Sequence, residues 1–177
     1  MSVQIINSSE FTEMPWKNGG GFTTELFRVH NGNDFKFRIS KAQIKNDGPF
    51  SIFPHIDRII MLDRGNGFSL KGPNVDEILK DIKTVFHFRG EESIECHLLD
   101  GPCIDFNVMT DRRYATTSLA LCELNENESV TFTSTNSLTI IYDSLENKIY
   151  KMDLKDSCSF NATTSKNLYV IGVDFNE

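Results

Sequence analysis

Hydrophobic and polar residues alternate with a period of two in several short runs of the chain. In residues 35–44, FKFRISKAQI, phenylalanine and isoleucine alternate with Lys36, Arg38 and Ser40. This alternation is typical of a β-strand with one buried face. Further β-prone runs lie at 58–62, 67–71, 84–88, 94–99, 104–109, 118–124, 129–133, 138–143, 148–152 and 167–173.

Turn-forming residues separate these runs. The glycines and asparagine of DRGNG, 63–67, are typical of a hairpin turn, and PNVDEILKDI, 73–82, is the one segment in which we expect a short helix. Many short strands with almost no helix predict an all-β sandwich or jelly roll. Strands fill both halves of the chain and no linker divides them, so we expect one compact body over 1–177 with two β-barrel halves.

The charge of the chain is uneven. The formal net charge of -7 argues against a nucleic-acid partner, since binding phosphates requires concentrated positive charge. All seven arginines lie within residues 1–113, whereas residues 114–177 contain four lysines and nine acidic residues. Because arginine is suited to bidentate recognition of carboxylates, we expect an anion site in the first two-thirds of the chain.

The first residues, MSVQIINSSEF, have neither a basic start nor a long apolar run, and no stretch approaches the roughly 20 apolar residues of a membrane helix. We therefore expect a cytoplasmic protein with no membrane partner. The cysteines show no CxxC spacing and are expected to be free thiols in a reducing compartment. They are Cys96, Cys103, Cys122 and Cys158.

Motifs for metal, cofactor or nucleophile chemistry are absent from the sequence. The four histidines form no HxH or HxxxH pair, and NGGGFTTE, 18–25, has neither the GxGxxG spacing nor the lysine of a phosphate loop. No GxSxG motif is present, although a spatial triad would leave no such signature. We expect no bound metal and no cofactor, and we favour a non-enzymatic protein over an enzyme.

Two segments offer candidate polar groups. In CIDFNVM, 103–109, Asp105, Asn107 and Met109 lie on one face of the predicted strand and the apolar residues on the other. That polar face lines a pocket or is the solvated face of an edge strand. In DGPFSIFPHIDR, 47–58, prolines and phenylalanines would hold Arg58 in place, or the segment is a packed connection with a surface arginine.

Five blocks carry a family resemblance across residues 12–113. They are MPWKNGGGFTTELFR, FRISKAQIKNDGPFSIFPHIDR, MLDRGNGFSL, FRG and GPCIDFNVMTDRR. Their order and spacing resemble the HutD/Ves family of bicupin proteins. The resemblance implies a cupin-type double-stranded β-helix in two fused halves, an association with histidine utilisation or stress, and, by analogy with cupins, a homodimer.

The resemblance also implies a ligand pocket within residues 12–113. Carried over block by block, its lining is expected from Trp16, Lys17, Asn18, Arg38, Ser40, Arg58, Asp105, Asn107 and Arg113. The three glycines beside Trp16 would let a tight segment lie against the barrel mouth. The family wording FPGxDR has glycine where this chain has His55, and a positive φ there would strain histidine by about 1 kcal/mol.

Two functions of different classes follow. In the first, the protein binds a small acidic metabolite without catalysis: Lys17 and arginines hold a carboxylate, and asparagines orient it. The association with histidine degradation makes urocanate and formylated glutamate candidate ligands. In the second, a metal-independent enzyme uses Asp105 or Asp57 as a general base on such an acid. A third, an interaction module, would have its pocket filled by its own side chains.

Overall fold

The computed structural model describes residues 3–16 and 19–176, and the regular secondary structure within these is almost entirely β-strand. The helix described is one short 3-10 turn, η1 (Ser8–Glu10). Two compact units are present, Phe11–Tyr114 and Met1–Glu10 with Ala115–Glu177. The single compact body over 1–177 stays a prediction.

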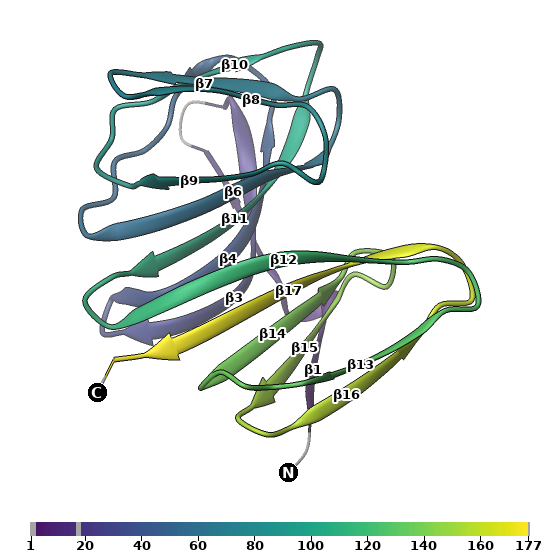
Figure 1. The fold of residues 1–177 in the computed structure, drawn as a ribbon. Helices are drawn as coiled ribbons and strands as arrows, with labels where there is room; N and C mark the ends of the chain where they lie inside the picture. The colour runs from purple at the N-terminus through teal and green to yellow at the C-terminus, as the bar shows by residue number, and fades with distance from the viewer. Residues whose placement is uncertain (1–2, 17–18, 177) are drawn as a thin grey trace. The chain divides into compact units, whose positions relative to one another are not determined.

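The larger sheet of the unit Phe11–Tyr114 contains six strands (Figure 1). Each pair of neighbours is antiparallel. The spatial order is β2 (Thr12–Pro15), β3 (Gly21–Asn31), β4 (Asp34–Ile44), β11 (Cys103–Asp111), β6 (Ile56–Arg64) and β9 (Val85–Arg89). Strand β11 is therefore an inner strand, bonded on both sides.

A second sheet of the same unit contains four strands. Their order is β5 (Gly48–Pro49), β10 (Glu95–Leu98), β7 (Phe68–Gly72) and β8 (Val75–Leu79). Apolar side chains from both sheets form one core, with Ile60 and Leu62 of β6 packed in the same cluster as Phe68 and Leu70 of β7. The unit is thus a two-sheet sandwich with its core between the sheets.

The other unit has the same construction. Its five-stranded sheet has the order β1 (Gln4–Asn7), β15 (Lys148–Asp153), β14 (Leu138–Asp143), β17 (Lys166–Phe175) and β12 (Ala115–Leu124), and its two-stranded sheet pairs β13 (Ser129–Thr133) with β16 (Ser157–Asn161). Ile141 and Leu168 of the larger sheet pack in one core with Phe160 of the smaller. Throughout the described residues the strands pair into open sheets.

Two local predictions are wrong. Residues 73–82 form no helix, because Val75–Leu79 pairs with β7 and buries Val75 and Leu79 on the core between the sheets. The segment 63–67 is no hairpin, because β6 is already paired on both sides and β7 belongs to the other sheet. Strand pairing overrides local propensity in both places: β8 pairs with β7, the strand just before it, and β6 pairs with the distant strands β9 and β11.

Within residues 3–16 and 19–176, no helix is long and apolar enough to cross a membrane.

Gly21, the last glycine of the run 19–21, lies at the start of β3 and packs closely against the neighbouring strand. A Cβ at Gly21 would overlap the backbone carbonyl oxygen of Gln43 on the neighbouring strand, whereas a Cβ at Gly32 meets open space and only the positive φ of +60° opposes it. We expect Gly21→Ala to lower the free energy of unfolding by about 2 kcal/mol or more, and Gly32→Ala by about 1 kcal/mol. Urea denaturation followed by tryptophan fluorescence measures both, and equal effects would contradict the close approach at Gly21.

Candidate functional site

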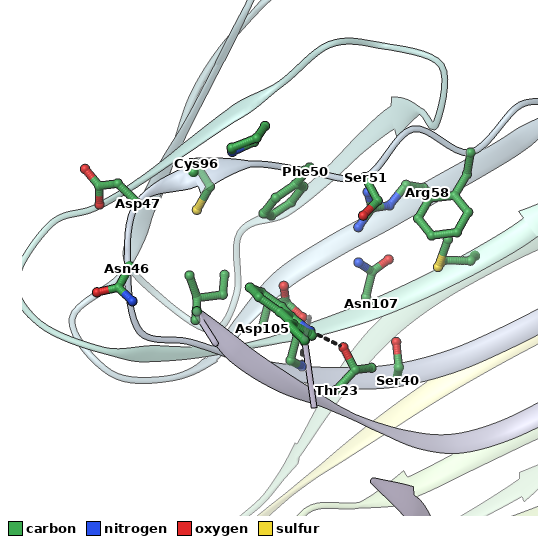
Figure 2. Close-up of a pocket in the computed structure, with 18 of the residues that line it drawn as sticks. Thr23, Ser40, Asn46, Asp47, Phe50, Ser51, Arg58, Cys96, Asp105 and Asn107 are labelled. Atoms are coloured by element: carbon green, nitrogen blue, oxygen red, sulfur yellow. Dashed lines mark hydrogen bonds between the residues drawn. The ribbon is translucent and has the colours of Figure 1, made fainter. Parts of the chain in front are cut away.

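A cavity of about 690 Å³ lies in the unit Phe11–Tyr114. That volume is within the range of roughly 300–1,000 Å³ that is typical of small-molecule sites. Figure 2 shows Ser40, Asp105 and Asn107 along one side of it and Phe50 and Ser51 on the opposite side. Polar side chains from strands and aromatic side chains from a loop therefore face the same space.

The strand register explains why polar groups gather there. Asn107 of β11 lies opposite Ser40 of β4, and Met109 lies opposite both Arg38 of β4 and Arg58 of β6. Because side chains at alternate positions share a face, these residues point to one side of the sheet. This decides between the two alternatives for residues 103–109: the polar face of β11 lines a cavity and is not the solvated face of an edge strand.

Of the two arginines on the cavity wall, Arg58 is the more deeply buried, with 6% of its surface exposed. Its guanidinium carbon lies 4.8 to 5.8 Å from the ring centroids of Phe50, Phe53 and Phe88. The prediction that the 47–58 loop holds Arg58 in place is confirmed by two of these rings. Burial lowers the pKa of Arg58 to about 10, against an opposing effect of Asp105, so the side chain is charged at neutral pH.

The two arginines of the cavity have different partners. Arg38 Nε donates to Glu25 Oε2 at 2.6 Å, and Arg28 Nη2 donates to the same oxygen at 2.8 Å. Among the described residues, Arg58 Nε has no hydrogen-bond partner, and neither has the buried Asn107 Oδ1. A cationic donor and a neutral acceptor are thus left available to a molecule in the cavity.

Asp105 is the buried carboxyl of the site, with 2% of its surface exposed. The Ala42 backbone N–H donates to its Oδ1 at 3.2 Å. Burial raises the pKa of Asp105 from 3.8 to about 7, and the charge of Arg58 only partly opposes the rise. Near neutral pH this carboxyl therefore exists in both protonation states.

Trp16 is one of the residues that line the cavity. Its ring nitrogen donates to Thr23 Oγ1 at 2.9 Å, and its backbone N–H donates to the Gly21 carbonyl at 3.0 Å. The indole also packs against the core between the two sheets. These contacts fix the tryptophan to the first residues of β3, as expected of an anchor beside the glycine run.

The turn before β6 contains His55, at the position where the family sequence FPGxDR has glycine. His55 has a φ of +68°, which is the left-handed conformation that favours glycine. Glu91 Oε1 accepts from the His55 backbone N–H at 2.7 Å, and Arg112 binds both oxygens of Glu91 at 2.6 and 2.9 Å. This ion pair holds the pKa of Glu91 at about 2 and secures the strained turn two residues ahead of Asp57.

The nine residues expected to line the pocket divide into three groups. Six of them line the cavity: Trp16, Arg38, Ser40, Arg58, Asp105 and Asn107. Lys17 and Asn18 lie outside the described residues. Arg113 is not among the cavity residues, and its Nη2 donates to Asp111 Oδ2 at 2.6 Å. The ligand-binding role of all nine stays a prediction.

Other cavity residues were not among the nine expected to line the pocket. They include Thr23, Asp47, Phe50, Phe53, Cys96 and Met109. The two phenylalanines belong to the loop expected to hold Arg58, so the sequence already indicated that they lie near this arginine. Thr23 reaches the site because it lies opposite Ala42 in the pairing of β3 with β4. Cys96 reaches it because β10 belongs to the second sheet. No local sequence pattern indicates either position. Among the described residues, no group of three or more His, Cys, Asp or Glu side chains could hold a metal ion.

Comparison with known proteins places the chain in a family. The HutD family model matches residues 8–171. The chain belongs to the HutD family. The family is associated with histidine utilisation.

Curated relatives match this chain over part of their length. An uncharacterized 21.2 kDa protein in the hutC 3' region of Pseudomonas putida is 39% identical over 111 residues, which are 60% of this chain and 57% of the relative. The protein Ves of Cronobacter sakazakii is 34% identical over 98 residues, 55% and 54% of the two chains. The chain thus spans about half the length of the curated relatives it matches.

Solved structures share the fold. HutD from Pseudomonas fluorescens SBW25 matches with a TM-score of 0.77 and 24% identity, covering 99% of this chain and 100% of that one. A conserved protein of unknown function from Pseudomonas aeruginosa PAO1 gives 0.86 at 22%, with the same coverage. The pirin YhhW of Escherichia coli, in complex with nickel(II), gives 0.65 at 8%, covering 97% and 98%. Because pirin is of cupin type, the predicted all-β, cupin-type fold is confirmed.

The buried carboxyl makes stability depend on pH. Between about pH 4 and pH 7 the folded protein keeps a proton on Asp105 that the unfolded chain has lost, so this contribution is full at low pH and disappears as pH rises through 7. Asp105→Asn has no such group. We expect its free energy of unfolding, relative to the wild type, to rise by about 2 kcal/mol from pH 5 to pH 8.

Urea denaturation at the two pH values measures this difference. Asp76→Asn is the matched control, because the Asp76 side chain is 74% exposed and pairs with Lys71 on the surface. The difference in free energy of unfolding between Asp76→Asn and the wild type should change by less than about 0.5 kcal/mol between the two pH values. A constant difference for Asp105→Asn would show that Asp105 is ionised throughout this range.

Proposed function

We propose that this HutD-family protein binds a small acidic metabolite without catalysing its conversion. The observation that carries the proposal is Arg58, a buried cation on the cavity wall whose Nε has no hydrogen-bond partner among the described residues. Burying a charge is costly unless a partner compensates it. A ligand carboxylate would supply that partner.

The surroundings of Arg58 support an organic acid as the ligand. Three phenylalanine rings pack around the guanidinium of Arg58. A planar anion would therefore bind to the N–H groups along the edge of the guanidinium. Asn107 Oδ1 is a further buried polar atom without a partner in the described part of the chain, so it would accept from a donor group of the same ligand.

The family context supports a regulatory role for such binding. HutD from Pseudomonas fluorescens and the hutC-region protein of Pseudomonas putida connect the family by name with histidine utilisation, and Ves is a further named relative. A protein that binds an acid of this pathway or of a stress response would report its concentration. Urocanate and N-formyl-L-glutamate are therefore the first ligands to test.

The test is isothermal titration calorimetry with a panel of these two acids and acetate. We expect Arg58→Gln to weaken the binding of the acids roughly 10- to 100-fold, because it removes a charge-assisted hydrogen bond worth about 1.5–3 kcal/mol. Arg64→Gln is the control, since Arg64 lies on the same strand with 67% of its side chain exposed. Equal affinities of the two variants, or no heat with any acid, would contradict the proposal.

A metal-independent enzyme is the second candidate function. It is favoured by Asp105, whose pKa of about 7 suits a general base near neutral pH. Asp57, the other candidate base, is not among the cavity residues; it accepts from Arg112 Nε at 2.8 Å, and its side chain is 53% exposed. The enzyme hypothesis therefore depends on Asp105.

Proton NMR of each acid incubated with the protein distinguishes the two functions. The binding hypothesis predicts that urocanate and N-formyl-L-glutamate are unchanged after a day at pH 7.5. Turnover that Asp105→Asn abolishes while calorimetry still detects binding would instead establish the enzyme.

A further inference from the structure

The carboxyl of Asp105 lies on the same cavity wall as Arg58. Both are buried, at 2% and 6% exposed, and they come from the adjacent strands β11 and β6. Their side chains face the cavity together with Asn107, which lies between the rows of Asp105 and Arg58 on the sheet (Figure 2). An acid bound to Arg58 would therefore bring a second carboxyl group close to Asp105.

The charged and titratable groups around Asp105 come from several strands. On β6 they are Arg58 and Asp63, of which the first favours the ionised form of Asp105 and the second opposes it. The thiols of Cys96 on β10 and Cys103 on β11 are close enough for Asp105 to raise their pKa values. On β4, the Ala42 backbone N–H binds Oδ1, and Arg38 is neutralised by Glu25.

Among the residues that the structure describes, Arg58 is then the nearby cation that has to serve two carboxyl groups when an acid is bound. Two carboxylates that share a site do not both ionise, because their repulsion raises one pKa strongly. A proton shared between them makes a short O–H···O⁻ hydrogen bond, which is stronger than a neutral one. In the free protein, burial already raises the pKa of Asp105 to about 7, so a further rise on ligand binding keeps this carboxyl protonated.

We infer, on the basis of the proposed function, that Asp105 is protonated in the complex and donates a hydrogen bond to the ligand carboxylate, so that acid binding takes up a proton. The proton passes from the solvent to the free Asp105 carboxylate. No carbon–oxygen bond forms or breaks, and the complex carries one negative charge on the pair. The site thereby responds to acid concentration and to pH together.

Calorimetry with N-formyl-L-glutamate, with acetate as a second probe, tests the inference. Neither probe titrates between pH 6 and pH 8.5, since carboxyl groups have pKa values of about 4. We expect the Kd to be nearly constant below pH 6.5 and to rise about tenfold per pH unit above pH 7.5. Titrations at pH 8 in phosphate and in Tris, which differ in ionisation enthalpy, should report an uptake of nearly one proton per ligand.

Asp105→Asn identifies the group that carries the proton. Its amide oxygen still accepts from the Ala42 N–H and its NH₂ donates to the ligand at every pH, so we expect binding at pH 8.5 at least as tight as that of the wild type, with no proton uptake. Asp76→Asn, on the surface of β8, should keep the pH dependence of the wild type.

The outcomes separate the inference from the proposed function. Binding of a probe by the wild type with a Kd that is constant from pH 6 to pH 8.5 overturns the inference and leaves acid binding in place. A pH dependence that survives Asp105→Asn also overturns it, because another group then carries the proton. Absence of heat with both probes at pH 6 contradicts the proposed function and the inference together.

Discussion

Strand β11 is hydrogen-bonded to β4 on one side and to β6 on the other, and this double pairing is the constraint on which the site depends. With both neighbours in register, alternate side chains of β11 face the cavity and the others face away. A slip of one residue would exchange Asn107 for an apolar neighbour. The polar lining is therefore as fixed as the sheet itself.

The cavity retains charges where a sandwich core would hold apolar side chains. Ile60 and Leu62 on β6 belong to the core between the sheets, and Arg58 on the same strand and face lines the cavity. One strand thus contributes to both the core and the site. Burial works against the charged forms of Arg58 and Asp105, as the lowered and raised pKa values show. Such perturbed groups in a cavity are characteristic of functional sites.

Rigid supports surround this polar wall. The Phe53 backbone N–H donates to the Gly90 carbonyl at 2.8 Å, and the Gly90 N–H donates to the Ile56 carbonyl at 2.7 Å, so the turn at residues 53–56 is held at both ends. Arg112 reinforces the same turn through Glu91 and the Ile56 carbonyl. This fastening explains how His55 keeps a left-handed conformation in place of the glycine of the family wording.

The sequence by itself determined the all-β class, most of the inner strands and six residues of the cavity wall, because period-two alternation and the family blocks are local signals. Strand β3 was missed: shifts in its register after Glu25 and Val29 interrupt the alternation. Only the tertiary structure decided that Val75–Leu79 is a strand, that 63–67 connects two sheets and that the polar face of 103–109 is buried. The strand at 75–79 depends on its pairing with the preceding strand β7, which overrides the local helix propensity. The other two depend on strands distant in the sequence, which contribute no signal at the position that they determine.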